Sequence, residues 1–310
     1  MGTLLRPRLA FRPGFLVLAV LLVVQGLSAA TPSHAVSPPI KLAIPMDADS
    51  PAAWSDAISG APSVGMIILN PANGPGDGLK ATYARLVDQA HANGIIVLGY
   101  VYTQWANGKV SVQQAEAWID RYYSWYHVDG IMLDEANDSC DPAPLGFYTA
   151  LYNYVKAEPR PGTVMLNPGK ATGECYASVS DVLLTFENDY ARYRGGYVGS
   201  SWTASFPPSH FFHIVFDVPG VAEMQTVIST AAERGAGWVY VTNLNDSTGN
   251  PYSSLPYYFA QELAQVEQLD HFVHDNQTAD QTTVPILLLL GLTAAGSAAI
   301  VAGARKKGAK

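Results

Sequence analysis

Short apolar runs alternate with longer amphipathic segments through the middle of the chain. Eight runs have the length and continuous apolar character of buried parallel strands: 41–46, 64–69, 95–100, 130–133, 163–166, 181–186, 211–216 and 238–242. Helix-compatible segments occupy 52–59, 79–92, 112–127, 145–157, 221–234 and 255–269, whereas 171–180 and 188–210 are expected to be loop-rich. Eight strands alternating with helices predict an α/β protein with a single-domain (β/α)8 TIM barrel.

Both ends of the chain carry an apolar segment of a different kind. Three arginines, the apolar run 15–24 and small residues up to Ala30 and Ala35 predict a secretory signal peptide over 1–35, cleaved after Ala30 or Ala35. Residues 284–304 are uncharged and apolar, as a transmembrane helix of about 20 residues requires, and the basic tail 305–310 follows. We therefore expect a barrel at 36–270, facing outside the cell membrane, and a polar stalk at 271–283.

The part predicted to be exported is strongly acidic. Seven of the 18 Lys and Arg residues lie outside 37–283, which leaves 11 against all 26 Asp and Glu residues and a net charge of −15. This charge argues against nucleic acid as a partner and is compatible with a neutral or cationic substrate. The only cysteines are Cys140 and Cys175. In an oxidising compartment, such a pair predicts one disulfide between two loops.

The carboxyl ends of the predicted strands are rich in carboxylates, amides and aromatic rings. In a barrel of parallel strands, these positions line the active site. The fourth strand ends at Asp134 and Glu135, and Glu187 follows the sixth. The candidates for substrate binding at the other strand ends are Asn70, Asn73, Tyr100, Tyr102, Asn167, His213, Thr242 and Asn243. Such groups suit sugars, whose apolar faces stack on aromatic rings while their hydroxyls form hydrogen bonds. For Tyr102 and Asn243 taken singly, a core or capping role is favoured.

These motifs together resemble the spherulation-specific family 4 (spherulin-4-like) glycoside hydrolases. The similarity runs through Asn70–Gly76, Gly99–Thr103, Gly130–Glu135, Phe186-Glu187, and Val241-Thr242 with Asn250-Pro251-Tyr252. The resemblance implies a (β/α)8 barrel that cleaves α-1,4-linked N-acetylgalactosamine within galactosamine-containing exopolysaccharides. It also implies that Asp134, Glu135 and Glu187 are the essential acids. The segment Pro45-Met46-Asp47 departs from the family pattern, which has an aromatic residue after the proline-apolar pair.

Glycoside hydrolysis needs one carboxyl group that protonates the leaving oxygen and a second that attacks the sugar or activates water. We expect Asp134 to be the nucleophile or base and Glu187 the general acid/base, with burial beside Phe186 raising the pKa of Glu187. Glu135 would orient Asp134 or hold a substrate hydroxyl.

The expected activity is therefore that of an endo-acting hydrolase of O-glycosyl bonds. No cofactor or metal is expected, because the histidines lack paired ligand spacing. Two alternatives stay open: a non-catalytic polysaccharide-binding surface protein, and a barrel hydrolase of another α-linked glycan.

Overall fold

The computed structural model describes residues 40–47, 50–157, 161–245, 247 and 249–271. In this part of the chain, eight parallel strands close into a barrel in chain order. They are β1 (Lys41–Met46), β2 (Val64–Leu69), β3 (Ile96–Tyr102), β4 (Gly130–Asp134), β5 (Thr163–Leu166), β6 (Val182–Asp189), β7 (Phe211–Phe216) and β8 (Trp238–Val241). The predicted barrel is confirmed. The largest difference is at β6, which runs three residues beyond Phe186 and so includes Glu187.

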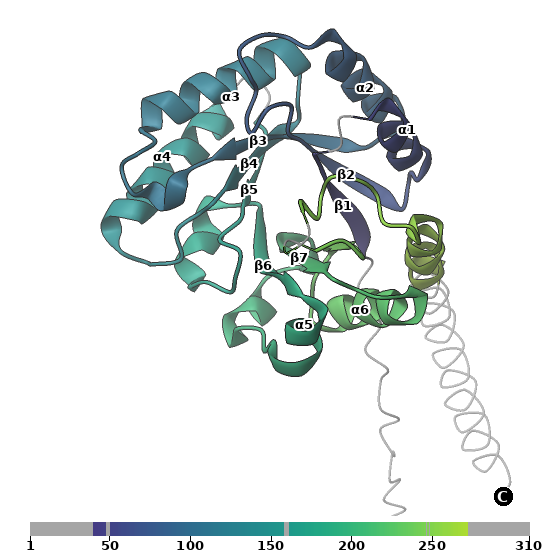
Figure 1. Ribbon diagram of the computed structural model, residues 1–310. Coiled ribbons are helices and arrows are strands. Elements are labelled where there is room, and N and C mark those ends of the chain that lie inside the picture. The colour runs from purple at the N-terminus through teal and green to yellow at the C-terminus, as the bar shows by residue number, and fades with distance from the viewer. Residues whose placement is uncertain (1–39, 48–49, 158–160, 246, 248, 272–310) are drawn as a thin grey trace, which may run out of the picture. The chain divides into compact units, whose positions relative to one another are not determined.

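Helices surround the barrel, as Figure 1 shows. The predicted helical segments are α1 (Pro51–Ser59), α2 (Ala81–Ala92), α3 (Val112–Tyr126), α4 (Pro142–Ala157), α6 (Val221–Glu233) and residues 259–271. Side-chain caps set two of their starts, because Ser50 Oγ accepts from Ala53 N and Ser111 Oγ accepts from Gln114 N. The segments expected to be loop-rich contain short helices instead: η2 (Glu174–Val179), α5 (Tyr190–Gly196), η3 (Ser201–Ser205) and η4 (Pro208–His210).

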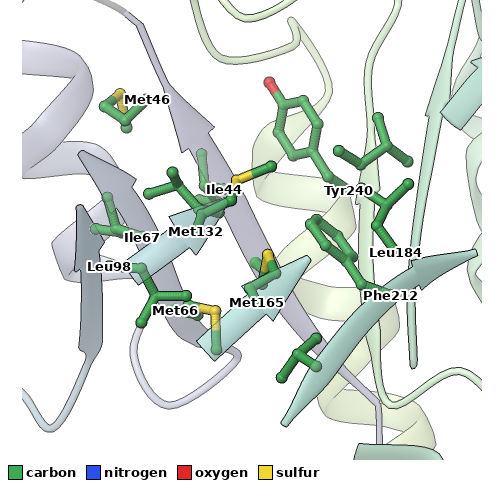
Figure 2. Close-up of a cluster of buried hydrophobic side chains, with 14 of the residues drawn as sticks. Ile44, Met46, Met66, Ile67, Leu98, Met132, Met165, Leu184, Phe212 and Tyr240 are labelled. Atoms are coloured by element: carbon green, nitrogen blue, oxygen red, sulfur yellow. The ribbon is translucent and has the colours of Figure 1, made fainter. Parts of the chain in front are cut away.

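Side chains fill the interior of the barrel. Met66, Met132 and Met165 come from three different strands and belong to one buried cluster (Figure 2). At two glycines, neighbouring elements approach so closely that no side chain would fit. A Cβ on Gly130 would lie 2.1 Å from the carbonyl oxygen of Thr163 on β5, and one on Gly99 would lie 2.4 Å from the ring of Tyr122 on α3. The interior of the barrel is therefore a packed core, so ligands can bind only at the ends of the barrel.

A disulfide joins Cys140 and Cys175, so the predicted pairing is confirmed. It ties the loop between β4 and α4 to η2, which lies between β5 and β6. Within the described residues, no helix combines the length and apolar character that a bilayer crossing needs. The predicted signal peptide, the helix at 284–304 and the basic tail lie outside the described residues, as does all of the predicted stalk except His271.

Candidate active site

A cavity of about 250 Å³ opens at the carboxyl ends of the strands. Its walls combine apolar barrel side chains with carboxylates, amides and two tyrosines, among them Asp134 and Glu187. A larger hollow of about 400 Å³ lies at the opposite end of the barrel, between the starts of β1 and β2 and the helical residues 259–271. None of the predicted site residues lines that hollow, so the smaller cavity is the candidate active site.

Asn167 holds the two central carboxyl groups of this cavity. Its Nδ2 donates to Asp134 Oδ1 at 2.7 Å and to Glu187 Oε2 at 2.8 Å. The Asn167 side-chain oxygen accepts from the backbone N–H of Gly169 at 2.8 Å, which fixes the orientation of the amide. Because Asn167 directly follows β5, one amide reaches acids on the strands at either side, β4 and β6. The ends of β4 and β6 thus meet at this amide.

Each of the two acids also accepts a hydrogen bond from its own tyrosine, on the carboxyl oxygen that Asn167 does not contact. The Tyr100 hydroxyl donates to Asp134 Oδ2 at 2.6 Å, and the Tyr252 hydroxyl donates to Glu187 Oε1. Burial is the main cause that raises the pKa of both Asp134 and Glu187 above the usual range. Repulsion from Asp134 raises the pKa of Glu187 further, whereas the tyrosine and Asn167 hydrogen bonds lower both values. The pair therefore retains a proton to higher pH than ordinary carboxyl groups do.

Glu135 lies beside the cavity and does not line it. Its φ of 50° ends the extended strand, so its side chain leaves the direction that Asp134 takes. Glu135 Oε2 accepts from Gln104 Nε2 at 2.8 Å. Burial raises the pKa of Glu135, and repulsion from Asp134 adds to this effect. The adjacent acids thus face different surroundings.

A third carboxylate in the cavity was not a predicted site residue. Asp47 Oδ1 accepts from Asn70 Nδ2 at 2.9 Å, and its Oδ2 accepts from Asn250 Nδ2 at 2.7 Å. In the sequence, Asp47 stands out only as a departure from the family pattern. No role was predicted for Asn250 or Tyr252, although both belong to the motif that carried the resemblance. They lie in the loop after β8, which has no strand pattern from which the directions of its side chains could be predicted.

The sequence model of spherulation-specific family 4 matches residues 44–266. The chain belongs to this family. Spherulin-4 of Physarum polycephalum is 31% identical over 247 residues, which cover 76% of this chain and 72% of that protein.

Two solved structures share the barrel with this family member. Sph3 of Aspergillus clavatus, in a crystal structure with GalNAc, has a TM-score of 0.65 at 22% identity over 74% of this chain and 98% of its own. A class V chitinase of Pseudomonas fluorescens Pf-5 has a TM-score of 0.52 at 11% identity over 74% and 99%. At these identities, the likeness establishes the fold.

In this spherulation-specific family 4 chain, four of the eight predicted substrate-binding residues line the cavity: Asn70, Asn73, Tyr100 and Asn167. The other four lie elsewhere. His213 is 1% exposed and bonded to Tyr193 and Thr185, and burial lowers its pKa to about 3.

Thr242 is fully buried and its hydroxyl accepts from Leu244 N. Asn243 accepts from Tyr257 N. The ring of Tyr102 packs on Trp118 of α3 with centroids 4.8 Å apart. The structure therefore brings none of His213, Thr242, Asn243 and Tyr102 to the cavity.

Proposed function

We propose that the protein is a glycoside hydrolase that cleaves α-1,4-linked N-acetylgalactosamine or galactosamine units within an exopolysaccharide. The observation that carries this proposal is the single amide of Asn167 that joins Asp134 and Glu187 inside the cavity. Two carboxyl groups facing one space are what glycoside hydrolysis requires. Membership of spherulation-specific family 4 and the GalNAc bound by Sph3 support the choice of sugar.

Both acids accept from a tyrosine and from Asn167, and the other contacts of each acid favour different roles for the two. Burial raises the pKa of Asp134, but the hydrogen bonds from Tyr100 and Asn167 and the backbone of Glu135 lower it, so these three contacts favour the charged form. Glu187 is buried beside that charge, which favours its protonated form. Asp134 is thus the nucleophile, and Glu187 is the general acid that protonates the leaving oxygen. Glu135 supports Asp134 from the neighbouring position.

The spacing of the acids favours a retaining mechanism. Asp134 Oδ1 and Glu187 Oε2 are no farther apart than the sum of 2.7 and 2.8 Å. Retaining glycosidases hold their carboxyl groups about 5–5.5 Å apart, and inverting ones about 6.5–9.5 Å. Asp134 then attacks the anomeric carbon while Glu187 gives its proton to the departing sugar. Ionised Glu187 next takes a proton from water, and that water releases the sugar from Asp134. Proton NMR of the first product should show the α-anomer; the β-anomer would contradict retention.

The charge of the cavity limits the class of sugar. Three carboxyl groups, those of Asp47, Asp134 and Glu187, line it, and its described lining contains no Lys, Arg or His. A uronic acid in this cavity would meet like charge, whereas a neutral N-acetylhexosamine or a protonated hexosamine would not. The lining therefore suits amino sugars, with or without the acetyl group.

The test is product release by residues 37–283 from a defined panel of polymers. Fully N-acetylated and partly deacetylated α-1,4-galactosamine polymers are compared with chitin and an α-1,4-glucan, and soluble products are read by mass spectrometry. We expect oligosaccharides of several lengths from the galactosamine polymers alone. Polymer that binds without cleavage would support the polysaccharide-binding alternative. Products from the glucan alone would support a hydrolase of another α-linked glycan.

We also propose that the chain is exported and tethered to the cell membrane with its barrel outside. The apolar segments at 1–35 and 284–304 motivate this placement, and the Cys140–Cys175 disulfide supports an oxidising compartment. Protease treatment of intact cells should release the barrel from the membrane fraction. Full protection of the barrel in intact cells, with digestion after lysis, would contradict the placement.

A further inference from the structure

Besides the active-site cavity, a second hollow, of about 390 Å³, lies at the same end of the barrel. The active-site cavity and this second hollow are together called the two hollows. It is formed by the end of β3, the loop that follows and the first turns of α3. Its lining combines two aromatic rings with amide and ammonium groups: Tyr102, Gln104, Lys109, Val110, Gln114 and Trp118. Aromatic walls with a few polar groups are typical of ligand sites.

Hydrogen bonds connect this hollow to the strand end that carries Asp134. Tyr102 is the register partner of Asp134 in the β3–β4 pair. Gln104 Nε2 donates to Glu135 Oε2 at 2.8 Å, and Trp105 N donates to Glu135 O at 2.7 Å. The second hollow is thus linked through Gln104 to Glu135, the chain neighbour of Asp134 in the candidate active site.

The loop that follows β3 holds an aromatic ring in solvent. Gln104, Trp105 and Ala106 have φ values of 49°, 54° and 53°, in the left-handed region that costs non-glycine residues about 1–3 kcal/mol each. Asn137 Nδ2 donates to Trp105 O at 2.9 Å and helps to fix this turn. The Trp105 side chain is nevertheless 50% exposed. The strained turn therefore presents the ring outward and does not bury it in the core.

We propose that Trp105 and the second hollow form an outer glycan-binding subsite, which binds a sugar unit of the polymer away from the bond that is cut. The Trp105 ring would stack on the apolar face of the sugar. Tyr102 and Trp118, whose centroids are 4.8 Å apart, form the aromatic wall, and the exposed Lys109 and Gln114 provide partners for hydroxyls. This inference rests on the proposed hydrolase function. It assigns Glu135 a positioning role, because Glu135 anchors the loop that carries Trp105.

The experiment compares Trp105→Ala with wild type on a long galactosamine polymer and on an oligosaccharide too short to reach the outer subsite. We expect kcat/KM to fall about tenfold on the polymer, as loss of one aromatic contact predicts, and to change less than twofold on the oligosaccharide. Trp105→Tyr should recover most of the loss. Tyr257→Ala, which removes an exposed aromatic outside both hollows, is the matched control. Equal loss on both substrates, or no loss on either, would overturn the subsite.

A binding measurement separates failure of the subsite from failure of the proposed reaction. Polymer binding is measured by affinity electrophoresis for Glu187→Gln alone and for Glu187→Gln combined with Trp105→Ala. The subsite predicts about tenfold weaker binding by the double variant, whether or not the wild type cleaves the polymer. Equal binding by the two proteins would refute the subsite, whereas absence of wild-type products would refute only the reaction.

Discussion

Replacement of Tyr252 by Phe tests which acid carries the proton. The Tyr252 hydroxyl donates to Glu187 Oε1, and this bond lowers the pKa of Glu187 because it favours the charged form. Its removal must raise that pKa. A hydrogen bond to a charged group contributes about 1.5–3 kcal/mol, which corresponds to about 1–2 pH units.

The assay is the pH dependence of kcat/KM for wild type, Tyr252→Phe and the exposed control Tyr257→Phe. A general acid must be protonated to act. The basic limb of the profile should therefore move to higher pH, by about 1–2 units, in Tyr252→Phe and stay in place in Tyr257→Phe. If Glu187 were the nucleophile, the acidic limb would move up instead and activity at neutral pH would fall. A profile with neither limb shifted would refute the reasoning.

Three further predictions concern other parts of the molecule. Asp47→Asn removes a charge from the cavity and should lower kcat/KM about tenfold on partly deacetylated polymer but little on the N-acetylated one; equal losses would contradict a role for this charge. Burial raises the pKa of Glu262 well above its usual range. The free energy of unfolding of the wild type, relative to Glu262→Gln, should therefore fall as pH rises above ~4.3. The slope is about 1.4 kcal/mol per pH unit for as long as the buried carboxyl keeps its proton, and the two proteins have no such difference in slope at lower pH. Parallel urea-unfolding curves from pH 4 to 7 would contradict this. Replacing both Cys140 and Cys175 by Ser should cost about 4 kcal/mol in denaturant unfolding, given the sequence separation of 35 residues, and a loss under about 1 kcal/mol would exclude that estimate.

The sign of the Glu262 effect follows from its surroundings. Both carboxyl oxygens are buried and make no hydrogen bond to the described residues. The folded state therefore keeps a proton that the unfolded state loses above its own pKa, and stability falls as pH rises. The Gln side chain does not ionise, so the stability of the Glu262→Gln variant lacks this dependence on pH.

The barrel was predictable because its strands are continuous apolar runs. Ile131–Leu133 is buried on both faces, and a run of this kind has few alternatives to a parallel strand. The positions of Asp134 and Asn167 followed from chain order, since parallel strands bring all their carboxyl ends to one face.

The loops and side-chain directions were not predictable in the same way. His213 lies in the apolar run of β7, and the run alone could not show that Tyr193 and Tyr197 would enclose its ring. Tyr252 reaches Glu187 across 65 residues of sequence from a loop without periodicity. Trp105 is displayed by three consecutive left-handed residues, a conformation that propensity disfavours for each of them.

In the proposed reaction, Asp134 and Glu187 together cleave the polymer. The most direct measurement is the rate at which new reducing ends appear from a galactosamine polymer, with wild type, Asp134→Asn and Glu187→Gln assayed side by side. Circular dichroism and thermal unfolding establish that each variant is folded. We predict turnover by the wild type and a loss of at least a thousandfold in both folded variants, of the order seen when a nucleophile or an acid is removed. Turnover close to that of the wild type in either variant would contradict the account.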